Sequence, residues 1–237
     1  MEGWLRESER RARLAESVLE ENQRKAHWSI ERREVELSTE ELGRGGWAVV
    51  RVAHFRGTRV AAKCFYQHIL VSRYNWQLSH REMNMATCFR HPNLVQFIGA
   101  SLEGEPLIVT KLMTMSLSSV LERGPIRHTQ ITSVSLDVCR ALNYLHLMTP
   151  DPIIHQNISS ANVLLDPLPH DCWKAKVSDY GSVNLFQQLQ MVCPGSPVYA
   201  APEANSPALQ STKMDIFNFS ILLVEMLTDE YPAVEQR

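Results

Sequence analysis

The pattern of polar and apolar residues divides the chain into a helical leader, a strand-rich part and a helix-rich part. Residues 6–25 lack Gly, Pro and Thr, and their charges form acid-first pairs four positions apart, an order that stabilises a helix surface. These pairs are Glu7/Arg11, Glu9/Arg13, Glu20/Arg24 and Glu21/Lys25. The pattern predicts a helix in a leader domain of residues 1–33.

Apolar residues in this leader follow a heptad repeat only in part, because Ser8 and Asn22 interrupt it. Two interpretations therefore stay open. Residues 4–26 form the end of a coiled coil through which the chain self-associates, or they form a single solvated helix.

Between residues 34 and 115, short runs of apolar, β-branched and aromatic residues are typical of strands. The predicted strands lie at residues 35–37, 48–55, 60–65, 94–99 and 107–112. The turn residues Gly57-Thr58 between the second and third runs indicate an antiparallel meander. A helical stretch is predicted around residues 73–90.

Beyond residue 116 the pattern is mostly helical. Residues 129–147 carry apolar residues at a spacing that predicts one core-facing stripe. These residues are Ile131, Val134, Leu136, Val138, Ala141, Leu142 and Leu145. A strand-rich part followed by a helix-rich part predicts an α+β fold with two lobes, rather than alternating βαβ units.

Composition agrees with a globular protein and excludes some functions. Hydrophobic residues make up 44% and charged residues 21% of 237 residues, and the net charge of −2 argues against nucleic acid as a partner. The 5 cysteines are odd in number and lack metal-binding spacing, which indicates a reducing compartment. The longest apolar run, Ile221–Val224, is too short to span a membrane. We expect a cytoplasmic protein.

Three glycines, Gly43, Gly45 and Gly46, lie between two predicted strands. Glycine lets backbone N–H groups approach a phosphate without an intervening Cβ. A dinucleotide-binding turn has similar glycines but opens a helix, whereas residues 49–55 here are strand formers. The strand-forming residues therefore argue against a dinucleotide-binding turn.

A single lysine, Lys63, interrupts the apolar run of residues 60–65. A buried ammonium group is costly unless an anion meets it, and Glu82 in the following helical stretch is a candidate partner. The alternative is that Lys63 extends its amine to solvent.

Four later segments complete an ordered set of motifs. They are residues 154–165 with Asn157 and Asn162, residues 176–181 with Asp179, residues 199–203, and residues 215–220. Together with the glycine turn and Lys63, they resemble the signature of protein kinase domains over roughly residues 35–237. Residues 159–162 (Ser-Ser-Ala-Asn) resemble the tyrosine-kinase-like group.

This resemblance implies a bilobal kinase fold with a five-stranded sheet and one helix in the N-lobe. The N-lobe and hinge would occupy residues 34–115, and a partial, mostly helical C-lobe residues 116–237. It also implies that Lys63 binds phosphates of ATP and pairs with Glu82, while Asn162 and Asp179 hold Mg²⁺. The glycines would cover the phosphates, and an apolar set would enclose adenine at the hinge. That set is Val50, Ala61, Thr110, Met113 and Leu164.

One departure from the family concerns catalysis. Asn157 stands at the proton-acceptor position, where the family has aspartate, and a carboxamide is not a usable base. Loss of a general base costs about 10²–10⁴-fold in rate. The expected function is an ATP–Mg-binding signalling regulator or scaffold, with a protein substrate or regulated protein as partner. The alternative is an active serine/threonine or dual-specificity kinase of low turnover.

Two smaller departures accompany it. Gln156 replaces an arginine that often binds an activation-loop phosphate, and Ala48 replaces the third glycine of the loop. The chain also stops soon after the stretch that resembles the central C-lobe helix, so we expect uncovered apolar surface on that helix. Three interpretations remain: a fragment of a longer protein, a domain completed by another chain, or a degenerate fragment whose only competent part is the leader.

Overall fold

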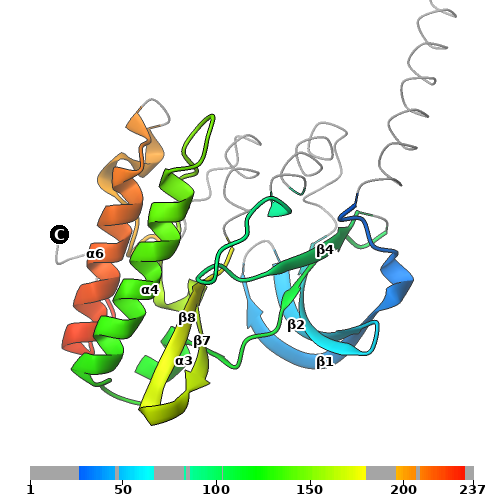
Figure 1. Ribbon diagram of the computed structural model, residues 1–237, viewed down its shortest axis with the longest axis horizontal. Helices are drawn as coiled ribbons and strands as arrows, with labels where there is room; N and C mark the ends of the chain where they lie inside the picture. The colour runs from blue at the N-terminus through cyan, green and yellow to red at the C-terminus, as the bar shows by residue number, and fades with distance from the viewer. Residues whose placement is uncertain are drawn as a thin grey trace, which may run out of the picture.

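The computed structural model describes residues 27–45, 48–66, 83, 86–102, 104–179, 196–206 and 209–232. In this part of the chain a β-sheet forms one lobe, and helices with a small second sheet form the other (Figure 1). The chain passes from the first lobe to the second at residues 112–114. The α+β, two-lobed fold expected from the sequence is confirmed.

The N-lobe is a five-stranded antiparallel sheet with the strand order β1-β2-β3-β5-β4. Its strands are β1 (Val35–Arg44), β2 (Ala48–Phe55), β3 (Thr58–Phe65), β4 (Phe97–Ser101) and β5 (Leu107–Lys111). The hairpin of β2 and β3 turns at Arg56 and Gly57, whose φ angles of 48° and 79° are both positive. Such a two-residue turn matches the twist of the flanking strands, which is why a glycine stands there.

The two faces of this sheet differ. Residues opposite one another in antiparallel strands share a face, and next-but-one residues along a strand do so too. One face packs a buried apolar cluster that includes Ala53, Val60, Ala62 and Val109. The register pairs Lys63 with Val50 and Ala61 with Thr110, so these four residues lie on the other face.

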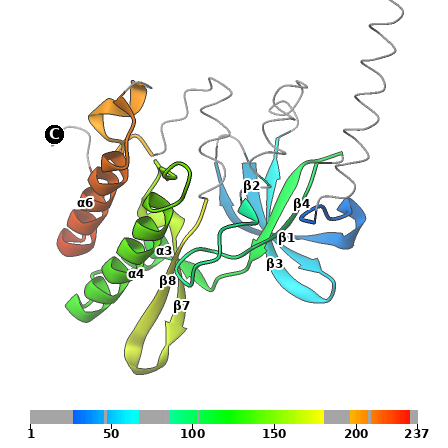
Figure 2. The ribbon, with the colours of Figure 1, turned by 45° about the horizontal axis from the view of Figure 1, so that its top comes forward.

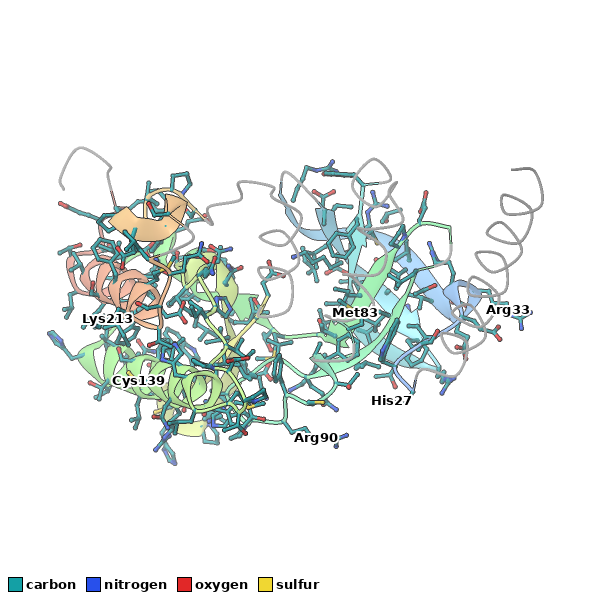
Figure 3. All side chains as sticks on the ribbon, turned by 90° about the horizontal axis from the view of Figure 1, so that it is seen from above. His27, Arg33, Met83, Arg90, Cys139 and Lys213 are labelled. Atoms are coloured by element: carbon teal, nitrogen blue, oxygen red, sulfur yellow. The ribbon has the colours of Figure 1, made fainter. Side chains whose placement is uncertain are left out.

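Residues 27–30 run along β4, the strand at the edge of the sheet. Ile30 donates a backbone hydrogen bond to Ala100 (3.0 Å), and Ala100 donates one to Trp28 (2.9 Å). The Trp28 side chain is buried with Met83 and Ala100, and Figure 3 shows Met83 and His27 among the N-lobe side chains. Residues 27–30 thus pair with the edge of the sheet, and the prediction that the leader helix extends to residue 33 is wrong for residues 27–33. Arg32–Glu34 instead form the 3₁₀-helix η1.

The C-lobe combines helices with a three-stranded sheet of order β6-β7-β8 (Figure 2). Its longer elements are β6 (Met115–Ser116), α3 (Leu117–Leu121), α4 (His128–His146), β7 (Val163–Leu168), β8 (Cys172–Val177) and α6 (Lys213–Thr228). Short 3₁₀-helices are η3 (Ser160–Asn162), η4 (Pro169–Asp171) and η5 (Pro202–Asn205). One apolar core joins α4, α6 and the small sheet.

Most sequence predictions for these elements are confirmed. Three of the strands match to within a few residues, and the helix predicted at 129–147 is α4. The first strand was predicted too short, because β1 continues past residue 37 to Arg44, and residues 94–96 precede β4. Leu136, predicted to face the core, is 49% exposed because it lies on the side of α4 opposite Val134 and Val138. Most of the helix predicted at 73–90 and all of the leader at 1–26 lie outside the described residues.

The central helix α6 carries apolar side chains on its outer face, as the sequence predicted. Ile216, Val224 and Leu227 are each 54% exposed, whereas Met214, Leu222 and Met226 are buried. Among the described helices, none is long and apolar enough to cross a membrane.

Candidate functional site

Two charged residues far apart in the sequence meet between the lobes. Lys63 on β3 donates a hydrogen bond from Nζ to Oδ1 of Asp179, which follows β8. The two side chains are 18% and 28% exposed, so neither is fully solvated. Asp179 has a φ angle of 67°, a left-handed conformation that is uncommon for a non-glycine residue. The structure thus meets the expectation that Lys63 faces an anion; Glu82, the partner expected from sequence, lies outside the described residues.

The segment from His155 to Asn157 is held by one buried carboxylate. Asp215 on α6 accepts hydrogen bonds from the backbone N–H groups of His155 (2.8 Å) and Gln156 (2.6 Å). His146 on α4 contacts the same carboxylate through Nε2 at 2.7 Å. Gln156 has a positive φ angle of 64°, so these bonds hold a backbone conformation that is costly by itself.

His155 connects this segment with the residue before Asp179. Its Nδ1 accepts a hydrogen bond from the backbone N–H of Asn157 (3.3 Å), so the ring proton resides on Nε2, which donates to the carbonyl of Ser178 (2.8 Å). Burial lowers the pKa of His155, although the nearby carboxylate of Asp215 opposes the effect. The ring is therefore a neutral structural link, not a proton carrier.

Asn157 and Asn162 are fixed by separate hydrogen bonds. Asn162 donates from Nδ2 to the backbone carbonyl of Asn157 (2.8 Å), which directs its Oδ1 away from that carbonyl. The backbone carbonyl of Asn162 accepts from the N–H of Ser178 (2.9 Å), which brings it close to Asp179. Asn157 accepts a hydrogen bond at Oδ1 from the backbone N–H of Ser196 (3.2 Å). Asp179 thus pairs with Lys63, and Asn162 is hydrogen-bonded to the residue before Asp179. Both side chains carry oxygen atoms, the ligands that suit Mg²⁺.

The glycine turn closes the end of the β1–β2 hairpin. Gly43 pairs with Val50, and Gly45 donates a backbone hydrogen bond to Ala48 (2.9 Å). A Cβ added to Gly43 would meet no atom within 4 Å, and one added to Gly45 would meet only the carbonyl of Ala48 at 3.9 Å. Packing against the described residues therefore does not require these glycines, whereas close approach of a ligand to the backbone would. Gly46 lies outside the described residues.

The apolar residues expected around adenine come from both lobes. Val50, Ala61 and Thr110 share the sheet face that carries Lys63. Met113 lies in the connection between lobes and is 7% exposed, and Leu164 lies on β7 in the C-lobe. The set thus includes residues of the N-lobe sheet, of the connection between the lobes and of the C-lobe sheet.

One buried polar network escaped the sequence analysis. Glu225 on α6 is 4% exposed and accepts hydrogen bonds from the hydroxyl groups of Tyr199 (2.5 Å) and Ser160 (3.0 Å). Burial raises the pKa of Glu225, and burial together with the Glu225 carboxylate raises that of Tyr199. The signal that could have revealed it is a glutamate within an apolar helix, since such a charge needs partners. This network joins residues 160 and 199 to α6.

Comparison with known proteins agrees with this geometry. Residues 37–237 match the family model described as the protein kinase domain. The chain is 34% identical over 220 residues to serine/threonine-protein kinase VIK of Arabidopsis thaliana, covering 88% of this chain and 50% of that protein. It is 30% identical over 236 residues to dual specificity protein kinase splA of Dictyostelium discoideum, covering 90% of this chain and 10% of that protein.

The chain therefore belongs to the protein kinase domain family. Its relatives include serine/threonine and dual-specificity kinases, and it spans half or less of the length of these two relatives. Kinases of this family generally use ATP and Mg²⁺ and act on proteins. Within the described residues no cluster of three or more His, Cys, Asp and Glu side chains could hold a metal ion by itself. A metal held by Asn162 and Asp179 would therefore need further ligands from phosphate or water, as Mg²⁺ commonly has.

Proposed function

We propose that this chain binds ATP with Mg²⁺, that its phosphoryl transfer to protein hydroxyl groups is impaired, and that it acts as a regulator or scaffold in signalling. The observation that carries the proposal is the meeting of Lys63 and Asp179 beside a loop whose proton-acceptor position is an amide. Binding groups are thus assembled, while the group that would take a proton is replaced.

The binding half of the proposal follows from charge. Lys63 would contact the phosphates, and Asp179 and Asn162 would ligate Mg²⁺ with their side-chain oxygens. Mg²⁺, when bound, supplies positive charge that offsets the phosphate oxygens. Lys63 and Asp179 form an ion pair, and a bound nucleotide with Mg²⁺ would place an anion beside the lysine and a cation beside the carboxylate.

The impaired half follows from Asn157. Its Oδ1 already accepts the N–H of Ser196, which would make it a positioning group for the chain that leads to Tyr199. A carboxamide can orient a hydroxyl group but cannot accept its proton at neutral pH. We expect transfer about 10²–10⁴-fold slower than with a carboxylate in the same place.

An active kinase of low turnover is the second candidate. It is favoured by the orderly attachment of the loop to Asp215 and by the serine/threonine kinases among the relatives. In this case water or a substrate group takes the proton, and the slow step remains the transfer.

Thermal unfolding with and without Mg–ATP tests the binding half. A ligand at 100 times its dissociation constant adds about 2.7 kcal/mol of stability, so the wild-type chain should unfold at a higher temperature. Lys63→Ala should lose most of this shift. The control variant Lys213→Ala should keep it, because Lys213 is exposed at the start of α6. No shift at millimolar Mg–ATP in the wild type would refute ATP binding.

Transfer of the γ-phosphate to a mixed peptide substrate tests the impaired half. Asn157→Asp should raise the rate about 10²–10⁴-fold, because a carboxylate then stands at the acceptor position. Rapid wild-type transfer that Asn157→Asp leaves unchanged would favour the active kinase instead.

A further inference from the structure

The short connection between the lobes is attached to the C-lobe by a single carboxylate. Asp166 on β7 accepts hydrogen bonds at Oδ2 from Nζ of Lys111 (2.8 Å) and at Oδ1 from Oγ1 (3.0 Å) and N (3.2 Å) of Thr114. Lys111 is the last residue of β5, and Thr114 directly precedes β6. Asp166 therefore holds both ends of residues 111–114.

The position of Asp166 on its strand relates it to the candidate adenine site. Side chains alternate between the faces of a strand, so Asp166 lies on the same face of β7 as Leu164. The register of β6 and β7 pairs Met115 with Leu165, which places Thr114 opposite Asp166. The connection between lobes is thus fixed next to the residue proposed as one wall of the adenine site.

These contacts are too exposed to contribute much to global stability. The side chains of Lys111 and Asp166 are 45% and 26% exposed, and ion pairs of this kind contribute little to unfolding free energies. Burial opposes ionisation of Asp166, but hydrogen bonds from Lys111 and Thr114 outweigh it and hold the pKa of this carboxyl group below its usual range. What the carboxylate supplies is geometry: it accepts three hydrogen bonds from one short segment.

We propose that Asp166 is a positioning residue for nucleotide recognition, which fixes residues 111–114 so that their backbone meets the adenine ring. This inference rests on the proposed ATP binding. Lys63, Asn162 and Asp179 would contact the phosphates and the metal. Asp166 instead affects only the binding of the adenine base, because it holds the connection between the lobes.

Calorimetric titration of the full chain with three ligands tests the inference: Mg–ATP, adenosine and Mg–tripolyphosphate. In Asp166→Ala the dissociation constants of Mg–ATP and adenosine should rise about tenfold, because the lost hydrogen bonds leave the adenine-binding segment in several conformations. The constant for Mg–tripolyphosphate should change less than twofold. Asp166→Asn keeps an acceptor for Thr114 and should fall between wild type and Asp166→Ala.

Asp137 offers a matched control on the same lobe. It accepts hydrogen bonds from Nζ of Lys174 (3.0 Å), from N of Ala175 (3.1 Å) and from Arg140 (3.4 Å). Within the part of the chain that the structure describes, none of its hydrogen bonds involves the connection between lobes. Asp137→Ala should lower the unfolding temperature and leave all three dissociation constants near their wild-type values.

Each contrary outcome has a separate meaning. Equal losses for Mg–ATP and Mg–tripolyphosphate in Asp166→Ala, or wild-type affinity for adenosine, would overturn the positioning role while leaving ATP binding intact. If Asp166→Ala does not fold, Asp166→Asn and Lys111→Met provide the same comparison. A wild-type chain that binds none of the ligands would refute the proposed function itself.

Discussion

Glu225 shows how a single residue can hold three parts of a kinase lobe together. Its carboxylate, almost fully buried on α6, accepts hydrogen bonds from the hydroxyl groups of Tyr199 and Ser160. Asn218, also on α6, donates from Nδ2 to the carbonyl of Tyr199. Residues 160 and 199 each lie three positions after the hydrogen-bonded residues Asn157 and Ser196, so their attachment to α6 positions this pair from within the lobe.

This network predicts an unusual dependence of stability on pH. Burial raises the pKa of Glu225 in the folded chain above its unfolded value. Protonated Glu225 therefore stabilises the fold, and this stabilisation is fully present at pH values below the unfolded pKa. That contribution is lost as pH rises through the folded pKa. Denaturant unfolding at several pH values should therefore show wild-type stability decreasing with rising pH relative to Glu225→Gln.

The size of the effect is checked with a second variant. Glu225→Leu removes the carboxylate that accepts from two buried hydroxyl groups, which can then hydrogen-bond only to each other (3.0 Å), and should cost about 1–3 kcal/mol at neutral pH. If the difference in unfolding free energy between wild type and Glu225→Gln stays constant with pH, burial does not shift the pKa of Glu225.

At the scale of elements, the segment at residues 27–30 is the clearest example of a shape that packing imposes. Its backbone pairs with Ala100 on β4, and its side chains lie directly over Gly99. An ideal Cβ on Gly99 would come within 2.7 Å of Cγ2 of Ile30 and 2.9 Å of the carbonyl oxygen of Trp28. The glycine is therefore required by the close approach of a neighbouring backbone.

Two glycine substitutions should separate packing from binding. Gly99→Ala forces the segment away from β4 and should lower the unfolding free energy by about 1–3 kcal/mol. Gly43→Ala, with nothing within 4 Å of the added Cβ, should change stability by less than about 0.5 kcal/mol yet weaken Mg–ATP binding several-fold. Urea unfolding and calorimetric titration measure both.

The cause of the first effect can be isolated. Ile30→Ala removes the nearer of the two clashing atoms, so the double variant with Gly99→Ala should lose less stability than the sum of the single variants. Strict additivity would show that the segment does not press on Gly99.

At the scale of the whole molecule, a few polar contacts connect the lobes across the candidate site. Lys63 meets Asp179 on one side of it, and Lys111 and Thr114 meet Asp166 at the connection. Each contact joins a residue of the N-lobe or the connection to a residue on or after a strand of the C-lobe sheet. Neutral backbone hydrogen bonds between residues 93–95 and Val177 also join the two parts, so salt and pH can alter only the charged share of the contacts between lobes.

The Asp166 contact predicts a pH dependence opposite in sign to that of Glu225. Its folded pKa is lowered, so its stabilising contribution is present above the unfolded pKa and is lost as pH falls through the folded pKa. Relative to Asp166→Asn, the wild-type chain should gain up to about 1 kcal/mol as pH rises through the acid range. Added salt should reduce this gain. If wild type and Asp166→Asn differ in unfolding free energy by the same amount at every pH, this prediction is wrong.

Local pattern was enough to predict the regular elements and the family. The strands of the N-lobe and α4 follow from local patterns, because a side chain's position on a strand or helix depends on near neighbours in sequence. The helix α6 was expected from the resemblance to the central helix of kinase C-lobes. The kinase motifs were recognisable because their residue types and order are preserved along residues 37–237. Leu136 marks the limit, since an apolar residue within a helix need not lie on its buried face.

The contacts of the site were decided only by folding. Lys63 and Asp179 are 116 positions apart, Lys111 and Asp166 are 55 apart, and Asn157 and Ser196 are 39 apart. No local pattern encodes such pairs, because their distance is set by how two sheets and α6 pack against one another. Residue types predicted which groups could bind phosphate and metal; the packed lobes determined that these groups meet, and that Asp166 holds the connection beside them.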